Sequence, residues 1–166
     1  MKTIHLRKLT AIMEVKGRTL FSKNLIIMPA FSLAFTYLIK MIYGNMDIGV
    51  DTSGYALSMG VLMNICMTGI YCVAALLAEE KEKHTLRTLM TSSVNGLEFS
   101  IGSLLPSLAL LIIVNVLCVF LSGMTFDASE WMAFLAVSTA ASMISCIIGM
   151  IFGIFAPNQM TPGTIT

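Results

Sequence analysis

The sequence predicts an all-α integral membrane protein with an amphipathic amino-terminal helix, four transmembrane helices and a short cytoplasmic helix between the second and third spans. Apolar residues make up 57% of its 166 residues and charged residues only 11%. A soluble domain usually carries about a quarter charged residues, so lipid must cover this surface. The apolar residues form four long segments, and most charges lie in residues 1–23 and 79–96.

Residues 1–23 are predicted to form an amphipathic helix in the headgroup layer. They hold six of the ten Lys and Arg residues, and a helical wheel separates Leu6 and Leu9 from Arg7 and Arg18. Basic residues opposite an apolar face are typical of interfacial helices. A frayed basic tail is the alternative. The segment lacks a signal-peptide pattern, so the first span is expected to direct insertion.

Residues 24–166 are assigned to one transmembrane domain. A helix rises about 1.5 Å per residue, so each apolar segment is long enough for a hydrocarbon core of about 30 Å. Pro29 lies in the first turns of the first span, where its missing N–H costs least, and Pro106 predicts a kink in the third span. The expected spans cover about residues 25–43, 55–78, 97–122 and 131–155.

Local signals place the starts of the last two spans. Asn95 and Glu98 have the spacing of a capping box just before the third span. Trp131 is expected to mark the membrane interface at which the fourth span begins.

The distribution of basic residues predicts the orientation. Residues 1–23 and 79–96 share one side of a four-span protein and hold nine of the ten Lys and Arg residues. By the positive-inside rule, the amino terminus is cytoplasmic. The tenth base, Lys40, either reaches the interface with its long side chain or is a functional intramembrane charge. The other side receives two loops without a base, whose acids are Asp47, Asp51, Asp127 and Glu130.

Polar side chains in the second and third spans form a candidate functional group. Asn64, Thr68 and Tyr71 have the spacing i, i+4, i+7 and should share one helix face. Asn115 lies in the middle of the third span. A polar side chain inside a membrane needs a partner. These residues either line a translocation path or form hydrogen bonds between helices.

A stripe of small residues in the fourth span predicts close helix packing. Ser142, Ser145, Gly149 and Gly153 lie near one face, and the two glycines form a GxxxG pair. Small residues allow two helix backbones to approach closely in a membrane. The close neighbour is expected either within the chain or in a dimer.

The sequence offers no catalytic or metal-binding set. Paired acids, a Ser/His/Asp set and the Walker spacing GxxxxGK[ST] are not found, and the four cysteines lie in apolar spans without a CxxC pattern. We therefore expect no catalytic residue, metal or cofactor in this chain, and an intramembrane enzyme is the least favoured function. A net charge of +1 gives no indication of nucleic-acid binding.

The 79–96 segment reads EEKEKHTLRTLMTSSVNG and is the charged connection between the second and third spans. Leu86, Leu89 and Met90 follow the spacing i, i+3, i+4, which predicts a short helix with one apolar face. That face either docks on a soluble partner or rests on lipid headgroups.

Residues 80–94 resemble the permease subunits of bacterial type-2 ATP-binding-cassette transporters. The family pattern runs acidic–basic–acidic, then Gly-Thr-Leu, a Leu three residues later and Ser/Thr-Pro-Val, between the second and third spans. His84 and Ser93 replace the usual Gly and Pro, and Ser103 stands where Lys often follows Gly102. The family also begins with an amphipathic cytoplasmic helix, as residues 1–23 are expected to do.

The resemblance implies a permease subunit of an ATP-driven exporter in the bacterial plasma membrane. It implies a nucleotide-binding ATPase subunit that holds ATP and Mg, and a second permease copy, identical or different. Such permeases usually have six spans, so the chain is expected to stop before two further ones. The alternative is a non-transporting membrane scaffold or immunity protein. In the family the 79–96 segment is the coupling helix, and its implied docking residues are Glu80, Glu82, Thr85, Leu86, Arg87, Leu89 and Met90.

Overall fold

The computed structural model describes residues 17, 26–44, 51–82 and 96–155, and the described chain is helical without a strand. The all-α prediction is therefore confirmed for these residues. The helices are α2 (Ile27–Tyr43), α3 (Thr52–Asn64), the π-helix η1 (Ile65–Cys72), α4 (Val73–Glu82), α6 (Gly96–Ser122) and α7 (Ala128–Phe155).

Three of the described helices are long and apolar enough to cross a membrane. They are Thr52–Ala78, Ile101–Ser122 and Ala128–Phe155. The fourth apolar helix, α2, has 17 residues, which correspond to about 25 Å and lie at the lower end of the range for a span. A crossing by α2 stays a prediction.

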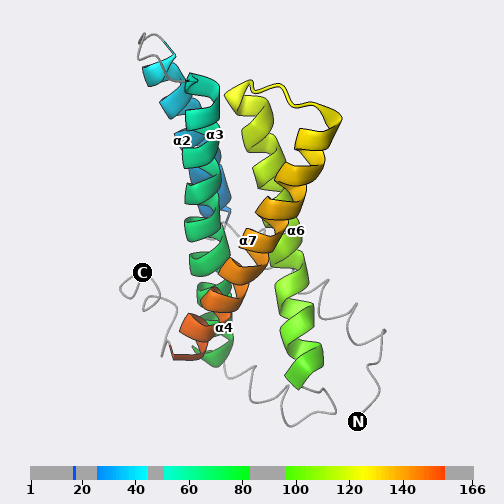
Figure 1. The fold of residues 1–166 in the computed structure, drawn as a ribbon. Helices are drawn as coiled ribbons and strands as arrows, with labels where there is room; N and C mark the ends of the chain where they lie inside the picture. The colour runs from blue at the N-terminus through cyan, green and yellow to red at the C-terminus, as the bar shows by residue number, and fades with distance from the viewer. Residues whose placement is uncertain (1–16, 18–25, 45–50, 83–95, 156–166) are drawn as a thin grey trace.

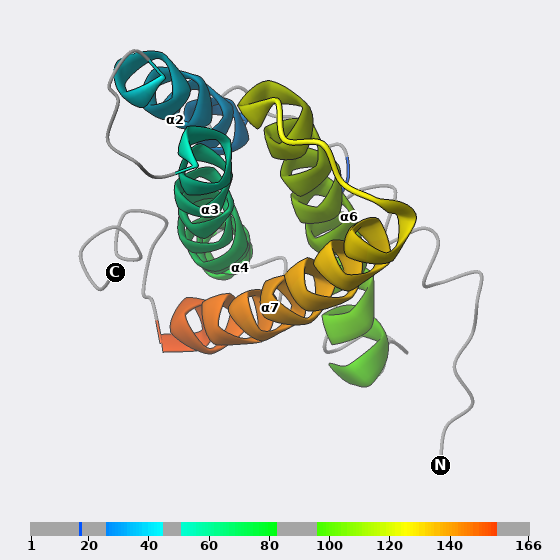
Figure 2. The same ribbon diagram turned by 45° about the horizontal axis from the view of Figure 1, so that its top comes forward.

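The helices form a bundle in which α7 crosses obliquely (Figures 1 and 2). The elements α3, η1 and α4 follow one another along one side, with α2 beside α3 and α6 across from them. The α7 helix begins near the end of α6 and ends beside α4. The start of α3 and the α6–α7 loop therefore share one end of the bundle, and the ends of α4 and α7 share the other.

Two acidic caps explain why two helices begin earlier than the spans expected at 55 and 131. Asp51 is the N-cap of α3, and its carboxylate accepts a hydrogen bond from the Ser53 N–H at 3.2 Å. The Glu130 carboxylate accepts one from the Asp127 N–H at 3.0 Å, as in a capping box. Trp131 consequently lies in the first turn of α7, where it contacts Phe126 and Phe134.

Pro29 and Pro106 both lie inside helices, as the sequence indicates. Pro29 is the third residue of α2, where backbone N–H groups have no intrahelical partner. Pro106 lies in the interior of α6, and one residue later the Ser107 hydroxyl donates to the Ser103 carbonyl at 3.3 Å. The kink expected at Pro106 stays a prediction.

Small polar side chains fill much of the interior, whereas large apolar side chains face outward. Asn64 and Asn115 are fully buried, but Phe120, Met132 and Phe155 are 69%, 74% and 76% exposed. Because lipid is as apolar as these side chains, helices in a membrane associate through close packing and hydrogen bonds. The distribution is therefore that of a bundle surrounded by lipid.

Candidate functional site

Four polar side chains from four different helices meet in the interior, and we call them the polar cluster. Asn64 Nδ2 donates to Asn115 Oδ1 at 2.8 Å and to the Leu111 carbonyl at 3.2 Å. Asn115 Nδ2 donates to Ser142 Oγ at 3.3 Å, and Ser32 Oγ, which donates to the Pro29 carbonyl at 2.8 Å, also lies 3.5 Å from Asn64 Oδ1. The polar cluster joins α2, α3, α6 and α7. Each hydrogen bond between helices in a membrane contributes about 1 kcal/mol or less to stability.

Thr36 extends this hydrogen bonding one turn along α2. Its hydroxyl donates to the Ser32 carbonyl at 2.9 Å and to Cys118 Sγ at 3.4 Å. A Cβ at Gly60 would overlap the Thr36 side chain. The glycine is therefore what lets α3 approach α2 so closely at this depth.

The π-helix η1 separates the three polar residues expected on one face of the second span. Asn64 and Thr68 are buried, but Tyr71 is only half-buried and packs against Cys72 and Leu76. A π-helix bonds residue i to i+5 and so has a wider turn than an α-helix. Because of this wider turn, Cys72 lies on the buried face of the helix. Regular α-helical spacing would place Tyr71 on that face. Thr68 Oγ1 has no hydrogen-bond partner among the described residues.

The stripe of small residues on α7 packs within the chain. Ser145 Oγ donates to the Ile65 carbonyl at 2.7 Å, at the first residue of η1. A Cβ at Gly149 would lie 2.6 Å from the Ile70 carbonyl oxygen, and one at Gly153 would lie 2.8 Å from the Leu77 Cβ. The close neighbours of this stripe are thus η1 and α4, while Ser142 faces Asn115.

Two lysines each bond to the carboxyl-terminal end of another helix. Lys40 Nζ donates to the Leu121 carbonyl of α6 at 3.1 Å, and Lys81 Nζ donates to the Ile154 carbonyl of α7 at 2.5 Å. The last carbonyls of a helix lack intrahelical donors, and a cation is favoured there. Lys40 and Lys81 therefore stabilise helix ends at opposite ends of the bundle.

Asp51 is an exposed carboxylate at the same end as Lys40. The hydrogen bond from the Ser53 hydroxyl, at 2.6 Å, lowers the pKa of the Asp51 carboxyl from its ordinary value of 3.8. Backbone N–H groups of Ser53 and Gly54 lower this pKa further. The carboxylate thus stays ionised while it caps α3.

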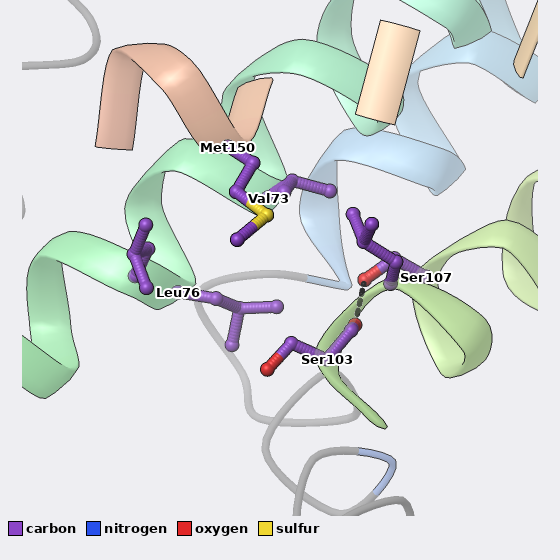
Figure 3. A pocket seen from close by; sticks show the side chains of 7 residues that line it. Val73, Leu76, Ser103, Ser107 and Met150 are labelled. Atoms are coloured by element: carbon purple, nitrogen blue, oxygen red, sulfur yellow. Dashed lines mark hydrogen bonds between the residues drawn. The ribbon is translucent and has the colours of Figure 1, made fainter. Parts of the chain in front are cut away.

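Two gaps separate α6 from its neighbours. An apolar groove of about 240 Å³ lies between α6 and α7, lined by residues that include Leu105, Leu108 and Ile147. A much smaller gap of about 10 Å³ lies between α6, at Ser103, Leu104 and Ser107, and the side chains of Val73, Leu76, Leu77 and Met150 (Figure 3). Ser103 Oγ is buried there without a hydrogen-bond partner among the described residues.

The docking residues implied for the 79–96 segment are mostly outside the described residues. Glu80 and Glu82 belong to α4. Thr85, Leu86, Arg87, Leu89 and Met90 lie in the part that the structure does not describe. The described residues hold no group of His, Cys, Asp and Glu that fits a metal ion.

The sequence interpretation missed Ser32, Thr36 and Gly60. Ser32 and Thr36 are spaced i, i+4 in the first span, which is the signal that singled out Asn64 and Thr68 in the second. Gly60 carried no signal, because its role depends on the neighbouring helix.

Comparison with known proteins identifies one family. The model of the family described as ABC-2 type transporter matches residues 14–166. The match covers α2 to α7 and the 79–96 segment. No curated protein and no solved structure matches the chain.

Proposed function

Because the chain belongs to the ABC-2 type transporter family, we propose that it is the permease subunit of an ATP-driven exporter. In this proposal a separate ATPase subunit binds ATP and Mg and drives the chain. The observation that carries the proposal is the family match together with the position of the charged 79–96 segment, which connects α4 to α6.

The proposed coupling works through the two helices attached to this segment. When ATP closes the ATPase subunits, the 79–96 segment is displaced, and the displacement passes to α4 and α6, which are continuous with it and shift relative to each other. Such motion alternates access to a path between helices by rigid-body shifts. The exposed apolar faces of α2 and α7 are available to lipid and to a second permease copy, identical or different.

The proposed orientation puts the 79–96 segment in the cytoplasm. In its support, the sequence just before α3 and α7, residues 44–51 and 123–127, holds acids and no base, whereas Lys81 lies at the opposite end of the bundle. In a Cys66→Ser background, Asp127→Cys should react with a membrane-impermeant maleimide in intact cells. Lys83→Cys should react only after permeabilisation, and the reverse result would exclude this orientation.

Co-purification tests the docking of the ATPase subunit. Leu89 lies on the apolar face that the sequence predicts for the 79–96 segment, and Thr88 lies on the opposite face of that helix. An ATPase subunit produced together with the tagged chain should co-purify with it, and Leu89→Asp should abolish the complex. Thr88→Asp adds the same charge and should leave the complex intact. An unchanged complex with Leu89→Asp would refute docking at this face.

A further inference from the structure

We infer that η1, α4 and residues 143–155 of α7 form one rigid unit, here called the helix pair, which moves against α6. The role of the helix pair is to make α7 move with α4 when the 79–96 segment is displaced. This role rests on the proposed function.

The helix pair is joined at its inner end by a hydroxyl. Ser145 Oγ donates to the Ile65 carbonyl at 2.7 Å, and the same hydroxyl occupies the space that a Cβ at Gly69 would need. A π-helix disturbs the regular i→i+4 bonding of a helix, and side chains that insert into a helix can bond its carbonyls. Ser145 therefore fixes α7 to the first turn of η1.

In the middle of the helix pair, backbone packs against backbone. A Cβ at Gly149 would lie 2.9 Å from the Gly69 carbonyl oxygen and 3.0 Å from the Ile70 Cα. A Cβ at Gly153 would lie 3.0 Å from the Ala74 carbonyl oxygen. Backbones at this separation leave no side chain between them that can change rotamer, so relative motion there requires the helices to separate.

The Lys81 ammonium closes the outer end of the helix pair. It donates to the Ile154 carbonyl in the last turn of α7. Lys81 is itself part of the 79–96 segment and lies one residue before the end of α4. A displacement of this segment therefore reaches the end of α7 directly.

The contact between α6 and the helix pair is of a different kind. Leu111 of α6 is buried in a cluster with Val73 and Cys146, and Leu104 and Leu108 of α6 pack against this cluster by their side chains. Both gaps described above, of about 240 Å³ and about 10 Å³, lie along this contact. Ser103 Oγ, buried there, lacks a partner among the described residues (Figure 3). Side chains and gaps can rearrange in small sliding motions, so this surface is where the helix pair moves.

The polar cluster provides the pivot. Asn64 directly precedes η1, and Ser142 lies one turn before Ser145 on α7. Both are tied to Asn115 of α6 by hydrogen bonds. Motion of the helix pair is therefore smallest at the polar cluster and largest at the end that holds Lys81.

Distances between spin labels test the helix pair in the whole protein, reconstituted in lipid nanodiscs. Cys66 and Ile151 are exposed residues on η1 and α7. Ala109 is exposed on α6 and does not line the groove. The first label pair joins Cys66 to Ile151→Cys, and the second joins Ala109→Cys to Ile151→Cys in a Cys66→Ser background. The buried Cys72, Cys118 and Cys146 stay in place and should not be labelled.

The distance distribution between α6 and α7 should be about twice as broad as that within the helix pair. Gly149→Leu should broaden the distribution within the helix pair. Ser145→Ala should do the same by a smaller amount and serves if Gly149→Leu fails to fold. Equal widths for the two label pairs would overturn the inference.

Adding the ATPase subunit separates this inference from the proposed function. ATP should shift the distance between α6 and α7 and leave the distance within the helix pair unchanged. A shift within the helix pair would overturn the inference. If ATP shifts neither distance in the assembled complex, the ATP-driven coupling fails, and the widths measured without ATPase still decide whether the helix pair is rigid.

Discussion

Asn64 Nδ2 donates a hydrogen bond of 2.8 Å to Asn115 Oδ1, and this bond joins α3 to α6 between two fully buried side chains. The same amide group also reaches the Leu111 carbonyl. The hydroxyls of Ser32 and Ser142 complete the arrangement on the other two helices. The bond is thus the centre of the contacts that hold the four apolar helices together.

Replacing both asparagines of this bond should lower the free energy of unfolding by less than the sum of the two single replacements. Asn64→Leu leaves the Asn115 amide buried with fewer hydrogen-bond partners, which should lower the free energy of unfolding by about 1–3 kcal/mol. The double variant Asn64→Leu with Asn115→Leu should lose less than the sum of the single variants, with a coupling of about 1 kcal/mol. Unfolding of the four proteins in detergent micelles measures this cycle. Strict additivity would show that the bond contributes nothing.

Gly60→Ala should destabilise the contact between α2 and α3. The added methyl group overlaps the Thr36 side chain, and overpacking of this kind costs about 1–3 kcal/mol. Thr36→Ala in the same chain should recover part of the loss, because it removes the overlapping hydroxyl and methyl but keeps a Cβ at 2.9 Å. Gly17→Ala is the matched control, since a Cβ at Gly17 meets nothing within 4 Å. Thermal unfolding of the purified protein compares these variants.

Lys40→Met should loosen the junction between α2 and the end of α6. It removes the donor to the Leu121 carbonyl, at a cost of about 1 kcal/mol. Lys40→Arg keeps a cation near the helix end and should therefore lose less stability than Lys40→Met. Hydrogen exchange of the last turn of α6 measures the effect. Equal exchange in Lys40→Met and the unchanged protein would refute this role.

The cap on α3 should weaken in acid. The pKa of Asp51 is lowered in the folded protein, so its stabilising contribution is complete above the ordinary pKa of 3.8 and is lost as the pH falls through the lower folded value. A carboxyl-carbon NMR titration should find the Asp51 pKa below 3.8. Ser53→Ala should raise it, because it removes the largest cause of the shift. Ser58→Ala should leave it unchanged, since Ser58 bonds the Gly54 carbonyl instead.

Much of the helical fold follows from the sequence because its causes are local. Long apolar segments have to bond their own backbone groups in a membrane, which requires helices. The acidic caps at Asp51 and at Asp127 with Glu130 are also visible as sequence patterns, although the interpretation placed both helix starts about three residues later. The spacing of Asn64, Thr68 and Tyr71 was read as α-helical, and η1 altered it.

From the amino-acid sequence it follows that this chain is helical and apolar, where its charges lie and which few polar side chains its spans contain. The partner of each of these side chains is known only from the folded chain: Asn115 for Asn64, the Ile65 carbonyl for Ser145 and the end of α7 for Lys81. Hydropathy and capping act within a few residues. A hydrogen bond between helices depends instead on how two distant segments rotate and cross, and closely packed residues such as Gly149 and Ile70 settle that geometry.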